Sequence, residues 1–406
     1  MQKIRFSCVN CNSEYDSATY LCPECEKKNS LPPKGVLKIL YNYDDINLSY
    51  KALKDANFLP ILPIEDIDFL SCLKVGKTPL YSFDSLKIKK GVSTKLPFKL
   101  FLKDEGQNPT YSFKDRASVM VAAYAKQMGF GKIVAASTGN AGSSLAGICA
   151  STNQEAIIMV PKTAPLAKLT QILMYGAKLI AVDGSYDDAF DFSIRATKEY
   201  GWYNRNTAFN PITVEGKKSV SLELYGDLGE KLPDYVFVSV GDGCIISGVY
   251  KGFEDLKKLG IVDKIPKIVG VQSEKSANTI NNIGTDSFKI TPATTIADSI
   301  SVDVPRNFYM TQRFLAEYDG DMIVVSDSQI LEASQILSRS TGIFSEPAAT
   351  CAFAGMLSFF ESAKIPKDAS CVVVLSGSGL KDLKSVQRII NMPKPIAPKI
   401  ENLKSC

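Results

Sequence analysis

Short apolar segments alternate with helix-like segments along most of the chain, and this alternation restricts the fold more than any other feature. Buried strands are predicted at residues 132–137, 156–161, 178–182, 235–240, 268–272, 322–325 and 371–375. Helical patterns follow the first three of these segments, at residues 141–150, 167–175 and 187–200. Strands that alternate with helices are typical of α/β architecture, in which helices connect parallel strands. The sequence therefore predicts an α/β fold with mostly parallel sheets.

Length and charge limit the number of domains and the kinds of partner. With 406 residues, 45% of them hydrophobic, the chain can bury two cores, so two domains and a small appendage are expected. Its 47 basic residues nearly balance 43 acidic ones, which argues against a nucleic-acid or membrane-surface partner. No apolar segment is long enough to span a bilayer, and residues 1–6 lack the apolar core of a signal peptide. We therefore expect a cytoplasmic protein.

A lysine at the start of a predicted helix is the strongest candidate for chemistry. Lys114 lies in the segment Asn-Pro-Thr-Tyr-Ser-Phe-Lys-Asp-Arg at residues 108–116, and the apolar run at 119–123 follows closely. An amine held where a helix enters the core loses solvation, which leaves an uncharged nucleophile able to form a Schiff base. The competing interpretation is a solvated surface lysine, as most lysines are. The chain has no histidine, so lysine, carboxylate, tyrosine or thiolate must carry any proton transfer.

Four cysteines near the N-terminus have the spacing of a metal site. They form the pattern Cys-x2-Cys-x10-Cys-x2-Cys at Cys8, Cys11, Cys22 and Cys25. Two such knuckles can present four thiolates to one tetrahedral zinc ion, and a site filled entirely by cysteine is structural and closed to substrate. A disulfide framework is the competing interpretation, but it is unexpected in a large chain without a secretory signal. The sequence therefore predicts a structural zinc knuckle.

Two glycine-rich turns follow predicted buried strands. The segment Gly-Asp-Gly-Cys-Ile-Ile-Ser-Gly at residues 241–248 comes after the strand at 235–240 and opens a helix that runs toward residue 258. Glycines at such a turn let backbone amides converge on a phosphate at the positive end of the helix. The second turn, at residues 375–382, ends the strand at 371–375. Either segment could instead be an ordinary tight turn between a strand and a helix.

The motif around Lys114, together with Ser-Thr-Gly-Asn-Ala at residues 137–141, resembles the fold type II pyridoxal-phosphate enzymes. Within them it is most similar to the threonine synthase family, whose relatives include threonine and serine dehydratases and cysteate synthase. The resemblance runs from about residue 103 to residue 382, with further matches at 175–177, 184–188, 210–218 and 346–349. It implies two α/β domains with parallel sheets, and pyridoxal 5'-phosphate bound as a Schiff base to Lys114.

The resemblance also implies roles for three further segments. The loop at 137–141 would bind the substrate carboxylate, and Asn140 would also hydrogen-bond the phenolic oxygen of the cofactor; the loop comprises Ser137, Thr138, Gly139, Asn140 and Ala141. The cofactor phosphate would lie on the first glycine turn, at Gly241, Asp242, Gly243, Cys244 and Ile245. Asp242 is an acid where an anion should bind, so we expect its side chain to point away or to cap the helix. In the second turn the hydroxyl of Ser376 would face the pyridine nitrogen, while Ser378 replaces the family's histidine.

One departure from the family concerns the substrate. Related threonine synthases usually have an arginine two residues before their Glu-Gly pair, where it binds the substrate phosphate, and this chain has Thr213 there. An anionic leaving group needs a guanidinium or several amides. Four cations elsewhere in the sequence are candidates to replace it, although each could be an ordinary structural charge: Arg205, which we take as the substrate-binding candidate, and Lys217, Lys218 and Arg306.

The resemblance therefore implies a lyase that converts O-phospho-L-homoserine and water to L-threonine and phosphate, with Lys114 as anchor and acid/base. One alternative is β-elimination or β-replacement on serine, threonine or phosphoserine, as in a dehydratase or cysteate synthase. Another is an inactive zinc-knuckle binding protein, which intact Lys114, Asn140 and Ser376 argue against. A nicotinamide-dependent oxidoreductase is discounted because no Gly-x-Gly-x-x-Gly fingerprint follows a first strand.

The order of the motifs predicts how the domains are arranged. Residues 1–29 would form the knuckle, residues 30–116 and 208–392 the large cofactor-binding domain, residues 117–207 the small α/β domain, and residues 393–406 an exposed tail. The cofactor would lie in the cleft between the two domains, at the carboxyl ends of strands. From the family we expect a homodimer.

Overall fold

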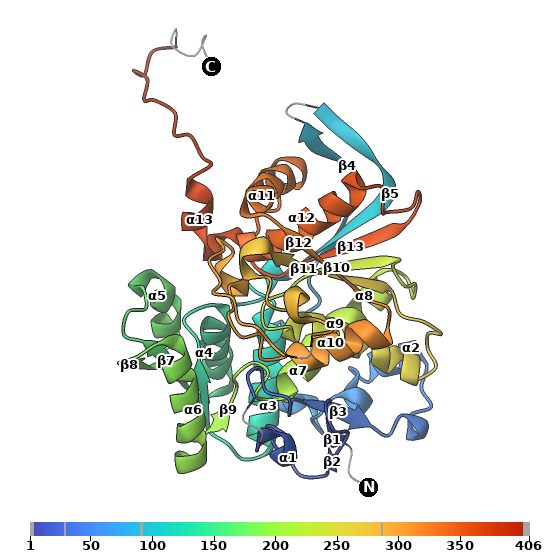
Figure 1. Cartoon of the computed structure of the whole chain (residues 1–406), viewed down its shortest axis with the longest axis vertical. Coiled ribbons are helices and arrows are strands. Elements are labelled where there is room, and N and C mark those ends of the chain that lie inside the picture. The colour runs from blue at the N-terminus through green and yellow to red at the C-terminus, as the bar shows by residue number, and fades with distance from the viewer. Residues whose placement is uncertain (1–3, 28–29, 90–91, 286, 401–406) are drawn as a thin grey trace.

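Three β-sheets organise the chain, which the computed structural model describes at residues 4–27, 30–89, 92–285 and 287–400 (Figure 1). The largest sheet has six strands in the order β12-β11-β10-β13-β5-β4, and only β4 is antiparallel to its neighbour. Its strands are β4 (Leu80–Lys89), β5 (Val92–Asp104), β10 (Tyr235–Ser239), β11 (Lys267–Ser273), β12 (Asp321–Val325) and β13 (Ser370–Leu375). The runs of valine and isoleucine in β10, β11 and β13 are buried, as central parallel strands require.

Helices cover both faces of this sheet and complete its two apolar cores. On one face lie α11 (Asp327–Thr341) and α12 (Pro347–Glu361), which belong to the core that includes Phe237, Val271 and Val373. The core on the other face includes Val238 and Val374. The helices that contribute to this second core are α8 (Ser219–Asp227), α9 (Cys244–Lys258) and α10 (Phe308–Glu317).

The second sheet is smaller and entirely parallel, in the order β8-β7-β6-β9. It contains β6 (Lys132–Ala136), β7 (Glu155–Pro161), β8 (Lys178–Val182) and β9 (Tyr203–Asn204), and its helices are α4 (Asn140–Thr152), α5 (Leu166–Met174) and α6 (Tyr186–Tyr200). In Figure 1 this unit, in green, lies beside the larger sheet, and α3 (Lys114–Gln127) and α7 (Ile212–Lys217) run between the two. All seven predicted strands and three predicted helices are confirmed within one or two residues at each end.

The N-terminal region forms a third sheet, which the sequence analysis did not predict. It is antiparallel, in the order β2-β1-β3, with β1 (Ile4–Cys8), β2 (Glu14–Tyr15) and β3 (Leu37–Tyr41). Helices α1 (Pro23–Glu26) and α2 (Tyr50–Asp55) accompany it, and α13 (Leu383–Gln387) is the last helix of the described chain. Short 3-10 helices occupy Tyr43–Asp45, Leu59–Ile61, Ile67–Phe69, Glu105–Gln107, Glu274–Ser276, Ile280–Asn282, Asp298–Ile300 and Gly379–Lys381.

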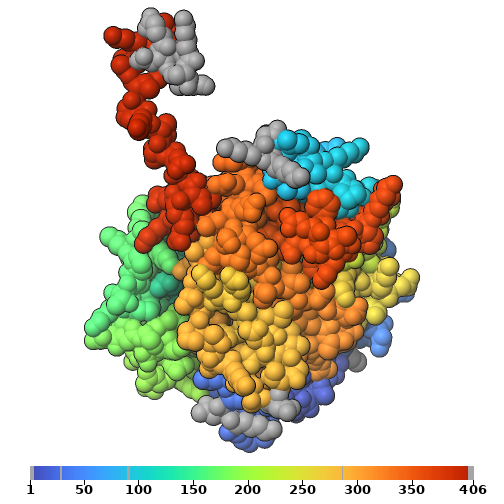
Figure 2. Space-filling view, turned by 45° about the horizontal axis from the view of Figure 1, so that its top comes forward, coloured from blue at the N-terminus to red at the C-terminus, as the bar shows by residue number. Residues whose placement is uncertain are grey.

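Residues 391–400 are all exposed, and the C-terminal segment projects from the body of the molecule (Figure 2). The predicted knuckle boundary at residue 29 and the tail end at 401–406 lie outside the described residues. The domain boundaries at residues 116, 207 and 392 stay a prediction. Among the described helices, none combines the length and apolarity that crossing a bilayer requires.

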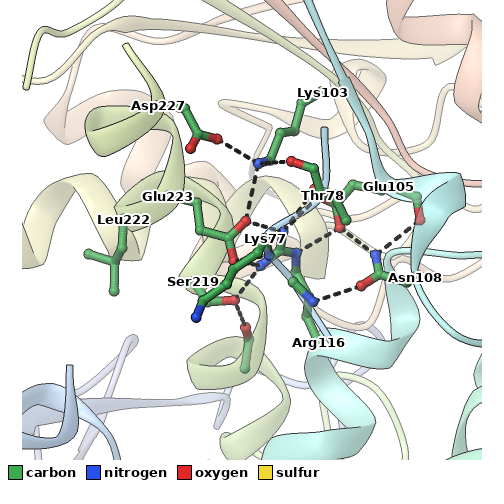
Figure 3. A network of polar contacts seen from close by, with 12 residues as sticks. Lys77, Thr78, Lys103, Glu105, Asn108, Arg116, Ser219, Leu222, Glu223 and Asp227 are labelled. Atoms are coloured by element: carbon green, nitrogen blue, oxygen red, sulfur yellow. Dashed lines mark hydrogen bonds and ion pairs between the residues drawn. The ribbon is translucent and has the colours of Figure 1, made fainter. Parts of the chain in front are cut away.

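A buried ion network fixes the start of α3 (Figure 3). Arg116 is 1% exposed, and its guanidinium donates to both carboxylate oxygens of Glu105, at 2.7 and 2.8 Å, and to both of Glu223, at 2.8 and 2.7 Å. Lys103 extends the network, because its ammonium lies 3.1 Å from Glu223 and 2.8 Å from Asp227. Planar two-pronged pairing of this kind restricts orientation as well as distance. The first turn of α3 is therefore held in one rotational setting.

A second buried network holds α7. Lys218 pairs with Glu215 at 2.5 Å and with Asp255 of α9 at 2.7 Å, and Lys251 also pairs with Asp255. Tyr41 of β3 donates a 2.6 Å hydrogen bond to Glu215. These fully buried charges satisfy one another, so they join the N-terminal sheet, α7 and α9 without an unpaired ion.

We expect Arg116→Leu to destabilise the protein strongly, because it leaves the buried carboxylate of Glu105 without its counter-ion and leaves Glu223 paired with Lys103 alone. Breaking a buried ion pair by removing one partner costs about 3–5 kcal/mol. The control is Arg5→Leu, which removes an exposed pair with Glu14 and should cost at most about 1 kcal/mol. Urea unfolding followed by tryptophan fluorescence and circular dichroism measures both, and equal losses in the two variants would contradict the role given to Arg116.

The same variant should change how stability depends on pH. Burial raises the pKa of Glu223, but Arg116 and Lys103 outweigh that effect and lower it from 4.5 to about 2. A carboxyl with a depressed pKa contributes stability above its unfolded value, and that contribution is lost as pH falls from 4.5 toward 2. The free energy of unfolding should therefore fall less between pH 4.5 and pH 2 in Arg116→Leu than in the wild type.

Candidate active site

A cavity of about 540 Å³ lies between the small sheet and the large domain's loops. Its walls come from the end of β6 and the start of α4, the start of α6, the segment after β9, and the loop between β11 and α10. Because β6 and β9 are parallel neighbours, their carboxyl ends meet at the same edge of the sheet, and the residues that follow both strands line the cavity. This is the position in which α/β proteins bind ligands.

Lys114 lines this cavity as the first residue of α3, as the sequence analysis predicts. Its side chain is half-buried, and burial together with the nearby charge of Arg205 lowers the pKa of Lys114 below its ordinary value of 10.5. No hydrogen bond or ion pair joins its amine to any residue that the structure describes. Burial and the lack of a partner favour the uncharged amine more than in an exposed lysine, and the position in the cavity wall argues against an ordinary surface lysine.

The loop at 137–141 also lines the cavity, and all five of its predicted residues do so: Ser137, Thr138, Gly139, Asn140 and Ala141. The loop connects β6 to α4, so it lies at the positive end of a helix, where an anion such as a carboxylate is stabilised. The Asn140 side-chain amide reaches across to the large domain, where it donates to Glu346 at 2.9 Å and to Ser299 at 3.2 Å.

Glu346 is a residue to which the sequence analysis assigned no role, although the segment 346–349 belongs to the matched family pattern. It lies immediately before α12 and is buried. Burial raises the pKa of Glu346 from 4.5 to about 7, and hydrogen bonds from Asn140 and Ser299 oppose that effect. Its carboxyl approaches the second glycine turn so closely that a Cβ on Gly377 would lie 2.4 Å from Oε1.

Ser376 lies beside the segment that carries the lysine. Its carbonyl accepts a 2.9 Å hydrogen bond from the backbone N–H of Phe113, next to Lys114, and Ser112 forms a β-bridge with Gly377. The structure thus brings Lys114, Asn140 and Ser376 together with Glu346. Ser376 itself is 9% exposed and is not among the residues that line the 540 Å³ cavity.

The first glycine turn connects β10 to α9 as predicted. Gly243 has φ +85°, and a Cβ there would lie 2.2 Å from Thr311 Oγ1, so only glycine fits. Of the two alternatives expected for Asp242, capping of α9 is not observed, because Gly243 occupies the cap position; Asp242 Oδ1 accepts from the backbone N–H of Arg306 at 3.3 Å. Asp242 lines the cavity, whereas Gly241, Gly243, Cys244 and Ile245 lie just outside its lining.

The four cations that are candidates to replace an arginine at position 213 lie in different environments. Thr213 is fully buried and donates to the Asn210 carbonyl. Lys218 is paired inside the second ion network. Arg306 stands at the cavity wall, where it pairs with Asp187 at 2.5 Å and its guanidinium lies 4.1 Å from the Phe190 ring centroid. Arg205 and Lys217 are therefore the two of the four without an acidic partner within ion-pair distance in the described chain.

Arg205 has a donor available for an anion. It is 1% exposed and lines the cavity, with Nη1 donating to Thr207 at 2.9 Å and Nε to Ser118 at 3.3 Å. Its Nη2 has no partner among the described residues, and burial lowers the pKa of Arg205 to about 10. A buried donor of this kind gains strongly when an anion binds it, because the unpaired group is otherwise penalised.

These features fit a phosphorylated aldehyde cofactor. The amine of Lys114 and the unsatisfied guanidinium of Arg205 line the cavity, and the turn that opens α9 with its free N–H groups reaches the cavity through Asp242. The amine suits an aldehyde, and the helix start suits a phosphate. The residues present are thus chemically matched to the group that the sequence resemblance implies.

The four N-terminal cysteines converge. Their sulfur atoms all lie within 4.8 Å of one another, with Cys8 and Cys25 at 3.8 Å and Cys11 and Cys22 at 3.6 Å. Four thiolates at about 2.3 Å from a tetrahedral zinc would be about 3.8 Å apart, so this spacing fits the ion. Asn10 donates to Cys25 at 3.2 Å, and Tyr15 lies 3.1 Å from Cys22.

The cysteine cluster is joined to the candidate site through Tyr20. Its hydroxyl accepts a 2.9 Å hydrogen bond from the N–H of Asn204, the residue before Arg205, and its ring stacks on Phe209 at 4.6 Å between centroids. These contacts link the knuckle region to the segment that carries the unpaired guanidinium of Arg205.

Comparison with known proteins assigns the chain to a family. The model of the family described as pyridoxal-phosphate dependent enzyme matches residues 72–377. A threonine synthase of Methanocaldococcus jannaschii is 33% identical over 399 residues, 95% of each chain, and one of Methanosarcina acetivorans is 31% identical over 98% of this chain and 97% of its own. Among solved structures, threonine deaminase isoform 2 of Solanum lycopersicum matches with a TM-score of 0.63 at 22% identity, over 79% of this chain and 88% of its own.

The structural match shares the fold, and the family model and relatives span most of the sequence, including the lysine motif and both glycine turns. The predicted α/β fold of type II is confirmed. The chain belongs to the pyridoxal-phosphate-dependent enzymes of fold type II and, within them, to the threonine synthase family.

Proposed function

We propose that this protein is a threonine synthase that converts O-phospho-L-homoserine and water to L-threonine and phosphate. The observation that carries the proposal is the cavity in which the free amine of Lys114 and the unpaired Nη2 of Arg205 both lie. An enzyme that releases phosphate from an amino acid needs both a basic amine and a cation for the leaving group. Relatives named threonine synthase that align along nearly the whole chain support the same reaction.

Pyridoxal phosphate, when bound, supplies an electron sink for the carbon next to the substrate's amino group. Lys114 would hold its aldehyde, Asn140 its phenolic oxygen and Ser376 its pyridine nitrogen. The turn that would hold its phosphate consists of Gly241, Asp242, Gly243, Cys244 and Ile245. A neutral hydroxyl at the pyridine nitrogen does not keep that nitrogen protonated as a carboxylate would, which favours elimination and replacement over transamination.

The substrate would be oriented at its two anionic ends. The amide groups at the start of α4, in residues 137–141, would bind the carboxylate, and the free donor of Arg205 would bind the phosphate. Glu346 holds the Asn140 side chain and thereby fixes the start of α4 against the large domain. Cations and amides placed before the reaction stabilise the departing phosphate without reorganising.

Lys114 would carry the proton transfers. Its uncharged Nζ would accept the proton from the substrate's α-carbon and then move a proton from the β-carbon as phosphate leaves the γ-carbon. The γ-carbon then takes up a proton to become a methyl group, the hydroxyl of water adds at the β-carbon, and the α-carbon regains a proton. Burial lowers the pKa of Lys114 and so makes its uncharged amine more available as a base than that of an exposed lysine, which suits a chain without histidine. We further propose a cytoplasmic homodimer with a structural zinc at the four cysteines and the domain boundaries given above.

The substrate is tested by incubating the purified holoenzyme separately with phosphohomoserine, phosphoserine, serine and threonine. Threonine and phosphate should form from phosphohomoserine, because only this compound carries a phosphate on its γ-carbon. Chromatography of the amino acids and a colorimetric phosphate assay measure the products. Pyruvate from serine or 2-oxobutyrate from threonine as the main product would instead assign a dehydratase, and sulfite-dependent phosphate release from phosphoserine would assign a β-replacement enzyme.

Replacing the lysine tests the catalytic assignment. Lys114→Ala should abolish the visible absorbance of the lysine-bound cofactor and reduce turnover at least about a thousandfold, since both the anchor and the base are lost. Lys132→Ala, which removes an exposed lysine paired with Glu155, is the control and should keep both properties. Turnover in Lys114→Ala close to that of the control would refute the assignment.

Metal analysis tests the proposed zinc site. The purified protein should contain about one zinc per chain, and Cys22→Ser should lose it and unfold at a lower temperature, because structural zinc contributes directly to folding. Cys72→Ser, which changes an exposed cysteine outside the cluster, should keep the metal. Elemental analysis and thermal unfolding measure the two effects. Four freely reactive N-terminal thiols and no metal in the wild type would show the proposal to be wrong.

A further inference from the structure

Lys217 is a fully buried lysine that the proposed mechanism does not use. It is the last residue of α7, and among the residues that the structure describes its ammonium donates only to the Thr213 carbonyl, at 3.3 Å. Its stem packs against α9, where a Cβ on Gly248 would lie 2.4 Å from Lys217 Cβ. Gly248 is about one turn beyond Cys244, the first residue of α9, so the lysine lies alongside the start of that helix.

The charges around Lys217 are unbalanced. The ionisable groups that face it are Cys244 and Asp242 from the glycine turn, Arg205 from the segment after β9, and Lys114 from α3. Asp242 is the one acid in this set, and it lies too far from Lys217 for an ion pair. Burial is the main cause that lowers the pKa of Lys217 from 10.5 to about 7, and the charges of Arg205 and Lys114 add to it.

The next residue provides a natural contrast. Lys218 is equally buried, but it pairs with Glu215 at 2.5 Å and Asp255 at 2.7 Å. Two adjacent lysines at the end of α7 therefore differ, because the fold supplies acidic partners for Lys218 and none within the described chain for Lys217. A buried cation without a counter-ion is destabilising unless a ligand supplies the charge.

The position of Lys217 indicates which ligand that is. The first N–H groups of α9 have no partner inside the helix, and the helix start attracts an anion. Arg205 Nη2, which is buried and unpartnered, lies in the same group of charges. A phosphate dianion at the start of α9 would satisfy the backbone donors and give Lys217 a counter-charge, while Arg205 Nη2 remains available for the phosphate of the substrate.

We propose that Lys217 is a cofactor-binding residue whose ammonium neutralises the phosphate of pyridoxal phosphate at the start of α9. This inference rests on the proposed function, because it takes the first glycine turn as the phosphate site. It adds a side-chain cation to a site that the glycine turn alone would build from backbone amides.

The proposed role of Lys217 makes the affinity for the cofactor phosphate depend on pH. When the phosphate binds, the pKa of Lys217 rises from its value of about 7 in the free protein, because an anion favours the charged amine. Binding above pH 7 is then accompanied by proton uptake, so affinity falls by up to about tenfold per pH unit as pH rises through that range. Below pH 7 the lysine is already charged and this dependence disappears.

The test uses the full chain without cofactor and the probe 4-deoxypyridoxine 5'-phosphate, which lacks the aldehyde and therefore does not react with Lys114. Lys217→Met should raise the Kd of this probe about ten- to a hundredfold and remove its pH dependence above pH 7. The Kd of 4-deoxypyridoxine, without the phosphate, should not change. Lys132→Met, at an exposed position, is the control and should bind both compounds as the wild type does.

The variant is expected to fold, because methionine removes an unpaired buried charge; the free protein should melt at the same or a higher temperature. Lys217→Gln provides a second neutral variant. Wild-type affinity of both variants for the phosphorylated probe would overturn the inference. The inference would also be overturned if the variants bound the phosphorylated probe normally and only their KM for phosphohomoserine rose. That result would assign Lys217 to the substrate phosphate. If the wild-type protein bound neither probe, the proposed function would fail together with the inference. Either of the two results with the Lys217 variants would refute the inference and leave the cofactor assignment intact.

Discussion

The orientation of the first turn of α3 is the constraint on which the site depends. Three consecutive charged residues leave this turn in different directions. Arg116 enters the buried pairs with Glu105 and Glu223, and Asp115 accepts hydrogen bonds from Thr110, at 2.7 Å to its N–H and 2.5 Å to its hydroxyl. With both neighbours fixed inside the protein, Lys114 is directed into the cavity. A rotation of α3 by one residue would require two buried ions to lose their partners.

The distribution of buried charge distinguishes scaffold from site. In the scaffold, acids and bases satisfy one another, as Lys218 and Asp255 do. In and beside the cavity, Arg205 and Lys217 have no acidic partner within the described parts of the chain, and the donors at hydrogen-bond distance from buried Glu346 are neutral. Groups of this kind destabilise the free protein and become favourable when ligand supplies the missing charge. The binding site can therefore be recognised by its unbalanced charges.

The N-terminal region contributes to this arrangement although it lies outside the two large sheets. Tyr20 connects the cysteine cluster to the backbone at Asn204, and Tyr41 connects β3 to Glu215 on α7. These contacts support, from the same side, the two segments that carry Arg205 and Lys217. Loss of order in the N-terminal sheet would reach the site through these two tyrosines.

Local patterns in the sequence predicted the alternating strands and helices and the reactive side chains. Apolar runs bounded by turns located the parallel strands, glycine marked the start of α9, and the spacing of four cysteines predicted their convergence, because each of these depends on neighbours within about a dozen residues. The antiparallel hairpin β4–β5 was missed because β5 alternates exposed and buried residues over much of its length and does not form a continuous apolar run. The N-terminal sheet was missed because β1 pairs with β3 across the intervening cysteine segment. Only the tertiary structure placed Glu346 on Asn140, 206 residues away, and left Lys217 unpaired beside Lys218. Charge balance in a core is a property of contacts between distant segments, and sequence order does not contain it.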